Sequence, residues 1–276
     1  MKKIGFVDYY ISEWHANNYP AWIEAANKTL GTDYCVAYAW AELDVSPVDG
    51  VSTDEWCDKF GVCRCGSIEE LCSRSDVIFI LAPSDPDKHL PYAKAVFPFG
   101  KRVYVDKTFA PDLATAKEIF SLAQAHNTPF FSTSALRYAT ELDELADATS
   151  LVITGGGGNW EEYAIHQVEM AVKLTGMHPH TVSQAKQGKQ RVVLVNGTGR
   201  DGQDKKITFV YAPSMPFTLC AEDGDGKSRY KTVRSDFFAA LLTDIVRFFE
   251  NGLPPFDPKE TLEVMALRDF ILNAEK

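Results

Sequence analysis

The feature that most constrains the fold is a regular alternation of short apolar segments and longer amphipathic ones. Residues 76–82, Asp-Val-Ile-Phe-Ile-Leu-Ala, are typical of a buried strand, and further strands are predicted at 3–8, 34–40, 103–105 and 129–132. Helices are predicted between them at 20–30, 53–60, 87–96 and 113–125, with another short helix after Ser67. Strands and helices at this spacing predict a mostly parallel sheet that is covered on both faces.

The pattern changes after about Ala135. Strands are predicted at 151–154, 190–196, 206–212, 217–221 and 230–233, and helices at 160–174, 236–250 and 258–273. Consecutive strands joined by turn-rich segments indicate an open, largely antiparallel sheet. The predicted fold is therefore an α/β domain with a doubly wound parallel sheet over 1–134, followed by a smaller α+β domain over 135–276. The final helices are free to pack back on the first domain.

Composition excludes several classes of function. The formal net charge of -10 and a pI of about 5.1 argue against binding to nucleic acid. No apolar run approaches the length of a membrane span. The first eight residues have a basic tip but lack the features of a signal peptide, so we expect a first strand and a cytoplasmic protein.

Four of the six cysteines form a cluster in the sequence, at Cys57, Cys63, Cys65 and Cys72. Their spacing, C-x5-C-x-C-x6-C, matches neither the CxxC pairs of zinc sites nor a small disulfide scaffold. We therefore expect reduced structural thiols and no bound metal.

A candidate catalytic cation lies in residues 101–111, Lys-Arg-Val-Tyr-Val-Asp-Lys-Thr-Phe-Ala-Pro. The short apolar strand in this segment delivers Asp106 and Lys107 at its carboxyl end, and Asp112 is a plausible N-cap for the next helix. Ligands of open α/β sheets bind outside the carboxyl ends of strands. Lys107 is therefore either a functional cation or a solvated lysine in a loop.

A second candidate group lies on the predicted helix 160–174. Glu162 and His166 are four residues apart and share a face, which Glu169 and Lys173 extend. This polar stripe is either a solvated helix face or one side of a binding site. In the second case Glu162 would orient the imidazole of His166, and a histidine is the usual general base near neutral pH.

With these residues placed, the chain resembles the glucose–fructose oxidoreductase/inositol dehydrogenase/MocA-like family. Residues 100–108, Gly-Lys-Arg-Val-Tyr-Val-Asp-Lys-Thr, are similar to that family's GKHVxxEKP segment, with Asp and Thr in place of Glu and Pro. Ala82-Pro-Ser followed by His89 is similar to its TP(N)…H stretch. Arg137-Tyr138 stands where the family has an Arg–Phe/Tyr pair.

The resemblance continues to the end of the chain. Glu162-x-x-x-His166, followed by Lys-Leu-Thr-Gly at 173–176, is similar to the family's DxGxH…xxLxG helix. The closing segment 237–272 is similar to its final helices. Each motif is weak alone, but their order and spacing together are fairly specific.

The resemblance implies a Rossmann domain that binds NAD or NADP, and a second domain that binds substrate and often forms the dimer contact, so we expect a homodimer or homotetramer. It implies hydride transfer between the cofactor and a carbinol of a sugar or cyclitol. His166 would take the hydroxyl proton, Lys107 would favour the developing negative charge on that oxygen, and Asp106 would position Lys107 or touch the cofactor. The residues expected around the cofactor are Asp8, Tyr9, Tyr10, Ile11, Trp40, Ala82, Pro83, His89, Asp106 and Arg137.

The sequence departs from the family at the cofactor loop. Residues 5–15 contain no glycine after Gly5, although glycines normally let backbone amides approach a pyrophosphate. Asp8 and Glu13 bring negative charge to this place, which opposes a dianion. The ribose-binding acid expected after the second strand is replaced by Trp40, which is able to stack on an adenine, with Glu42 as the nearest acid. The helix start near Ser12 still offers amides to an anion.

Three functional hypotheses remain. The first is an NAD(P)-dependent dehydrogenase of a sugar-like alcohol, favoured by Lys107 with the Glu162/His166 pair. The second is a non-catalytic ligand-binding or regulatory protein of the same fold, favoured by the missing glycines. The third is a lyase or hydrolase that uses a tightly held cofactor transiently. The sequence does not name the substrate.

Overall fold

The computed structural model describes residues 1–274, and the chain divides into two compact units. Unit 1 consists of Met1–Thr133 and Phe238–Pro258. Unit 2 consists of Ser134–Phe237 and the residues from Lys259 onward. Within residues 1–274, none of the helices combines the length and the apolar character that a membrane span needs.

Unit 1 is built on a six-stranded parallel sheet with the order β3-β2-β1-β4-β5-β6. The strands are β1 (Lys2–Asp8), β2 (Tyr34–Ala41), β3 (Cys63–Arg64), β4 (Val77–Ile80), β5 (Arg102–Val105) and β6 (Phe130–Ser132). All four residues of β4 are buried, as the predicted central strand requires. From β1 the chain adds strands first on one side, to β3, and then on the other side, from β4 to β6. Ligands of such sheets bind at this switch point between β1 and β4. The predicted doubly wound α/β fold is confirmed.

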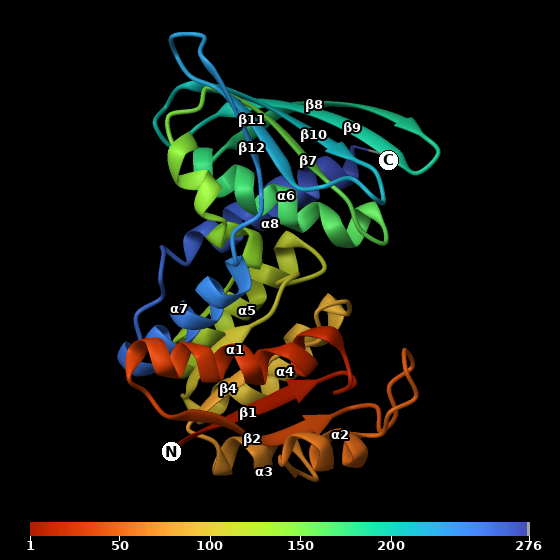
Figure 1. Cartoon of the computed structure of the whole chain (residues 1–276), viewed down its shortest axis with the longest axis vertical. Helices are drawn as coiled ribbons and strands as arrows, with labels where there is room; N and C mark the ends of the chain where they lie inside the picture. Colours follow the sequence, from red (N-terminus) through yellow and green to blue (C-terminus); the bar gives the residue numbers. More distant parts are fainter. Residues whose placement is uncertain (275–276) are drawn as a thin grey trace. The chain divides into compact units, whose positions relative to one another are not determined.

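Helices pack with this sheet in unit 1: those that alternate with its strands run from red to green in Figure 1, and one from later in the chain is blue. They are α1 (Trp14–Leu30), α2 (Thr53–Phe60), α3 (Ile68–Arg74), α4 (His89–Val96), α5 (Leu113–His126) and α7 (Phe237–Asn251), with short 3₁₀ turns at Pro86–Lys88 and Phe97–Phe99. The predicted N-cap at Asp112 forms, because its side chain accepts from Thr115 N. Ser67 caps the short helix that follows it, and its side chain accepts from Glu70 N.

One helix boundary was wrong in the sequence analysis. The first helix does not begin near Pro20 but at Trp14, so Pro20 lies inside it. An interior proline costs about 3 kcal/mol because it removes a backbone hydrogen bond. Ala16, Tyr19 and Ile23 are buried at helical spacing on both sides of this proline, and their packing holds the helix together.

Unit 2 has a second six-stranded sheet, with the order β12-β11-β7-β10-β9-β8. Its strands are β7 (Ser150–Gly155), β8 (His178–Gln187), β9 (Gln190–Thr198), β10 (Asp204–Tyr211), β11 (Thr218–Glu222) and β12 (Ser228–Thr232). Only β7 and β10 pair in parallel, so the prediction of a largely antiparallel sheet is confirmed. The edge strand β8 was not predicted, because its sequence is polar and mostly exposed and forms a strand only by pairing with β9.

Helices α6 (Trp160–Thr175) and α8 (Lys259–Asn273) form the other half of the core of unit 2. Ile165, Val168 and Val172 of α6 pack in one buried cluster with Ile153 and Phe209 of the sheet. Short 3₁₀ turns at Ala135–Tyr138 and Thr140–Leu145 precede β7. On the sheet, Val152 and Val192 are 40% and 43% exposed, so the two strands that carry them have an apolar side chain facing solvent.

Glycines in the run 155–158 are required for close packing. A Cβ atom on Gly155 would lie 2.5 Å from the ring of Phe217. Gly157 has a φ of 152° and lies against the ring of Tyr163, 2.0 Å from where its Cβ would be. Glycine at 155 and 157 therefore serves the close approach of aromatic side chains.

Candidate functional site

The end of β5 places two ionisable side chains at the carboxyl edge of unit 1, as the sequence predicted. Lys107 is 8% exposed, and its Nζ donates to the carbonyl oxygen of Pro83 at 2.9 Å. The backbone N of Lys107 donates to Oδ1 of Asp106 at 2.7 Å. The loop that follows β4 therefore holds the ammonium group, and the preceding carboxylate fixes the peptide of Lys107.

Asp106 has a further partner that sequence reasoning missed. Nδ1 of His15 contacts Oδ2 of Asp106, and the hydroxyl of Tyr19 donates to the same carboxylate at 3.3 Å. The ring of Tyr19 also stacks on that of His15 at 5.1 Å. Burial alone would raise the pKa of Asp106, but the attraction of His15 and Lys107 lowers it below its ordinary value. The i, i+4 spacing of His15 and Tyr19 was a visible signal, but only after α1 is known to begin before Pro20.

Asp8 ends β1 as a buried carboxyl group. Its Oδ1 accepts from the backbone N of Tyr9 at 2.7 Å and of Ala82 at 2.9 Å. Its Oδ2 is buried and has no hydrogen-bond partner. Burial and the neighbouring Glu13 carboxylate raise the pKa of Asp8 well above its usual value. Ala82 has a φ of 62°, so this residue adopts a left-handed conformation uncommon for a residue with a Cβ.

The segment after Asp8 forms an ordered turn. Ser12 Oγ donates to Oδ2 of Asp49 at 2.7 Å, and Ser46 Oγ donates to the carbonyl oxygen of Ser12 at 2.9 Å. Glu13 is the N-cap of α1, and its side chain accepts from the backbone N of His15 at 2.7 Å and from that of Ala16. Ile11 is buried at this turn, whereas Tyr10 is partly exposed.

Residues at the end of β2 form a small polar group. Glu42 accepts from Lys88 Nζ at 2.6 Å and from the Tyr92 hydroxyl at 2.8 Å, and its hydrogen bond to Lys88 lowers its pKa. Lys88 Nζ lies 4.4 Å from the centre of the Tyr9 ring. The ring of Trp40 is half-buried and packs edge-on against Tyr92 at 5.8 Å.

His89 connects two loops of the carboxyl edge. Its Nδ1 lies 3.0 Å from the carbonyl oxygen of Phe109, and its Nε2 lies 2.5 Å from that of Leu81. The ring is fully buried, which lowers its pKa although both carbonyl contacts oppose the shift. In this geometry His89 supports the loops after β4 and β5, and any effect on a ligand passes through those loops.

In unit 2, His166 lies on the partly exposed side of α6. Its Nδ1 is 2.7 Å from the hydroxyl oxygen of Ser134, a partner that the sequence analysis did not identify. The rings of Tyr163 and Phe217 flank the imidazole at 5.5 and 5.8 Å. Glu162 lies on the first turn of the helix, where Nδ2 of Asn159 donates to its Oε2 at 3.2 Å.

Glu169 was predicted to extend a polar stripe that is either a solvated helix face or one side of a binding site, and the structure rules out solvation for this residue. Its side chain is buried and accepts from Arg137 Nη1 at 2.9 Å and from the backbone N of Ser134 at 3.2 Å. The second nitrogen of Arg137 pairs with Glu260, which also lies 3.4 Å from Arg200. Burial alone would lower the pKa of Arg137, but its two carboxylate partners outweigh this effect, and the pKa is raised above its ordinary value. The guanidinium stabilises the segment that carries Ser134.

The predicted site residues thus lie in two groups. Those in unit 1 lie at the ends of β1, β2, β4 and β5, except His89, which begins α4; they are Asp8, Tyr9, Tyr10, Ile11, Trp40, Ala82, Pro83, His89, Asp106 and Lys107. Those in unit 2 are Arg137, Glu162 and His166. All six cysteines are free thiols. Among residues 1–274, no three His, Cys, Asp or Glu side chains are grouped as a metal site.

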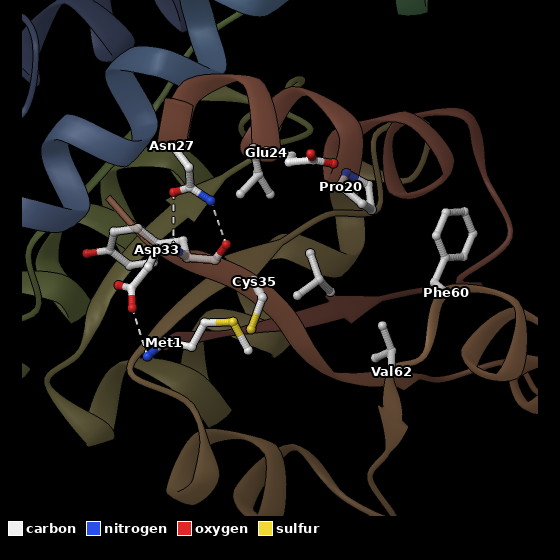
Figure 2. A pocket seen from close by; sticks show the side chains of 11 residues that line it. Met1, Pro20, Glu24, Asn27, Asp33, Cys35, Phe60 and Val62 are labelled. Atoms are coloured by element: carbon white, nitrogen blue, oxygen red, sulfur yellow. Dashed lines mark hydrogen bonds and ion pairs between the residues drawn. The ribbon is translucent and has the colours of Figure 1, made fainter. Parts of the chain in front are cut away.

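A cavity of about 370 Å³ lies at the other end of the sheet of unit 1. Figure 2 shows side chains that line it, among them Pro20, Cys35, Phe60 and Val62. Its polar groups are already paired: the side chain of Asn27 bonds the backbone N and O of Tyr34 at 3.0 and 2.7 Å. The cavity therefore offers few free partners to a polar ligand. It also lies at the start of β2, away from the carboxyl edge.

Comparisons with known proteins agree on the fold. No protein-family model matches the sequence. A segment of 58 residues is 40% identical to the uncharacterized oxidoreductase YhhX of Escherichia coli; it covers 21% of this chain and 17% of that relative.

Solved structures match over the whole chain. UDP-N-acetylglucosamine 3-dehydrogenase GnnA from Acidithiobacillus ferrooxidans has a TM-score of 0.75 and 13% identity, covering 99% of this chain and 97% of its own. GenD2 from gentamicin A biosynthesis, in complex with NAD, has a TM-score of 0.75 and 12% identity over 99% and 94%. Biliverdin reductase from Synechocystis, in complex with biliverdin and NADP+, has a TM-score of 0.68 and 14% identity over 99% and 98%. At these identities the likeness shows the fold, which this chain shares with all three proteins.

Proposed function

We propose that this protein is an oxidoreductase of the glucose–fructose oxidoreductase/inositol dehydrogenase/MocA-like type, which transfers a hydride between NAD or NADP and a carbinol of a sugar- or cyclitol-like substrate. The observation that carries the proposal is Lys107, a nearly buried ammonium group at the carboxyl edge of a sheet with the order 3-2-1-4-5-6. Ligands bind at this edge in open α/β sheets. The fold is shared with solved structures bound to NAD and to NADP+.

The residues of unit 1 favour a nicotinamide dinucleotide at the ends of β2 and β5 and oppose it at the end of β1. Glu42 follows β2, where an acid commonly bonds a ribose hydroxyl, and Lys107 follows β5. The half-buried Trp40 offers a face for an adenine. The turn from Asp8 to Glu13 contains no glycine and carries two buried carboxyl groups, so it is the unfavourable part of the site.

The chain's own residues would divide the chemistry as follows. A bound nicotinamide cofactor supplies the hydride acceptor or donor. Nε2 of His166 would take the substrate hydroxyl proton, while Nδ1 faces the Ser134 hydroxyl, which fixes the orientation of the ring. Lys107 would stabilise negative charge on the substrate oxygen, and the carbonyl oxygen of Pro83 holds its ammonium group in place.

Calorimetric titration with NAD, NADH, NADP and NADPH is the first test. Micromolar binding of one of them is the expected result, followed by turnover in a screen of sugars and cyclitols. A folded protein that binds none of them at millimolar concentration contradicts the proposal.

One observation favours a second candidate, a ligand-binding protein without redox chemistry. The side chain of Glu13 already bonds the first free amides of α1. A protein of this kind would bind a polyhydroxylated ligand without consuming NAD(P)H, and the same titration and screen separate the two functions.

We also propose a homodimer or homotetramer. Exposed apolar side chains on the sheet of unit 2, such as Val152 and Val192, favour cover by another protein surface. Light scattering at several concentrations measures the mass directly, and a monomer at all of them contradicts this proposal.

A further inference from the structure

The amino end of α1 is the place in unit 1 where a phosphate group would bind. A helix amino end presents free N–H groups and a partial positive charge, and in this type of fold the helix after the first strand receives the pyrophosphate. Here α1 has 17 residues and follows β1 at the carboxyl edge of the sheet.

Those N–H groups are already bonded to an anion that the chain itself supplies. The carboxylate of Glu13 accepts from the backbone N of His15 at 2.7 Å and from that of Ala16. Glu13 is 8% exposed, so its carboxylate is held in the protein and does not project into solvent. A pyrophosphate oxygen would need the same donors.

The turn that carries Glu13 is fixed by other contacts. The Ser12 hydroxyl is bonded to Asp49, and the Ser12 carbonyl oxygen accepts from Ser46 Oγ. Because residues 8–13 include no glycine, the turn has little freedom to take another backbone shape. Glu13 therefore cannot move far without breaking these bonds.

The charges around Glu13 make a second anion costly. The carboxyl groups of Asp8 and Asp106 are buried nearby and repel the Glu13 carboxylate, whereas His15 attracts it. Burial, which is only partly offset by His15, raises the pKa of Glu13. An incoming pyrophosphate would add negative charge to this group of acids.

We propose that Glu13 is a specificity-determining residue that competes with pyrophosphate for the amino end of α1. This inference deepens the proposed function, since it explains how a chain with this fold would bind NAD(P) weakly. A dinucleotide binds only when the Glu13 carboxylate leaves its amides, and ligands that place no phosphate there do not compete with it.

The test compares binding by the wild type, Glu13→Gln, Glu13→Ser and Glu24→Gln. The glutamine keeps the side-chain length but is a weaker acceptor, and serine is a good N-cap that keeps the helix start folded. Glu24 is an exposed glutamate of the same helix, paired with Lys28, and serves as the control. The probes are inorganic pyrophosphate, NADH and NADPH, and circular dichroism checks the fold of each variant.

We expect both Glu13 variants to bind pyrophosphate about tenfold or more tightly than the wild type, with a similar gain for NADH or NADPH and no change in Glu24→Gln. Affinities that stay unchanged in both Glu13 variants, or an absence of any binding, overturn the inference. Tight dinucleotide binding by the wild type that the variants do not improve leaves the dehydrogenase proposal standing without it. A gain for pyrophosphate alone supports the role of Glu13 and removes the cofactor from the proposed function.

Discussion

The two groups of buried charges in this chain are arranged differently. In unit 2, Arg137 lies between Glu169 and Glu260, and both of its carboxylate partners accept hydrogen bonds. In unit 1, the buried acids Asp8, Glu13 and Asp106 interact with one another at the carboxyl edge, and Oδ2 of Asp8 has no hydrogen-bond partner. Native proteins seldom leave a buried polar atom unsatisfied, and such exceptions concentrate at functional sites. Unit 2 also has buried polar atoms without a partner, such as Trp160 Nε1 and Gln167 Oε1. The contrast therefore concerns the two charged groups themselves: several interacting acids at the carboxyl edge of unit 1, and an arginine paired with two carboxylates in unit 2.

The largest expected effect concerns His166, whose partner Ser134 is held by Glu169, the ion-pair partner of Arg137. If His166 is the general base, His166→Ala lowers kcat/KM by about 10²–10⁴-fold, because the proton has no acceptor in the transition state. Ser134→Ala, which removes the partner of Nδ1, should cost about tenfold or less and shift the pH profile. Initial rates of NAD(P)H absorbance change measure both effects. The exposed His126 on α5 provides the control, His126→Ala, and full turnover by His166→Ala removes the assignment.

The next effect tests whether the Arg137 network is structural. Arg137→Met leaves the buried Glu169 without its ion-pair partner, so we expect a loss of about 3–5 kcal/mol in the free energy of unfolding. Urea denaturation followed by circular dichroism measures it. Arg247→Met, which removes an exposed partner of Asp244, should change stability by about 0.5 kcal/mol or less. Equal stability of Arg137→Met and Arg247→Met would contradict a structural role for the Arg137 network.

The smallest effect concerns Asp8, whose Oδ2 has no hydrogen-bond partner. The pKa of Asp8 is raised in the folded protein, so the folded state binds this proton more tightly than the unfolded state does. Its contribution to stability therefore falls as pH rises from about 4 through the folded pKa. Asp8→Asn removes that decline, and we expect it to gain about 1–3 kcal/mol over the wild type at neutral pH, but less near pH 4. Thermal unfolding from pH 4 to 9 measures the difference, and a gap that shrinks as pH rises contradicts this explanation.

The fold class and most helices and strands were predictable from the sequence, because hydrophobic periodicity and helix caps are local signals. The buried strand β4, the cap at Asp112 and the position of Lys107 directly after β5 all follow from it. Strand β8 did not, since a polar edge strand gains its structure from a neighbour that is separate in sequence. The early start of α1 was hidden by Pro20, and only buried packing on both sides of it reveals the helix.

The contacts of the candidate site were less accessible to prediction. His15 and Asp106 are 91 residues apart, and Ser134 and His166 are 32 apart, so no local pattern pairs them. Glu169 was grouped with the polar face of α6 because it is spaced with His166 and Lys173, but Arg137 comes from another segment and makes the burial of Glu169 favourable. The catalytic roles of Lys107, Glu162 and His166 remain predictions.

The assignment of α7 to unit 1 and α8 to unit 2 has a practical consequence. The chain leaves unit 1 after Thr133, returns at Phe238 and leaves again after Pro258. A fragment that stops at Thr133 would lack Phe248 and Phe249, whose rings pack against Phe131, Phe79 and Tyr34. Such a fragment would expose those aromatic side chains to water and tend to aggregate. Expressing unit 1 alone requires joining residue 133 to residue 238 by a designed linker. A series of truncations from the carboxyl end alone will not yield the complete unit 1.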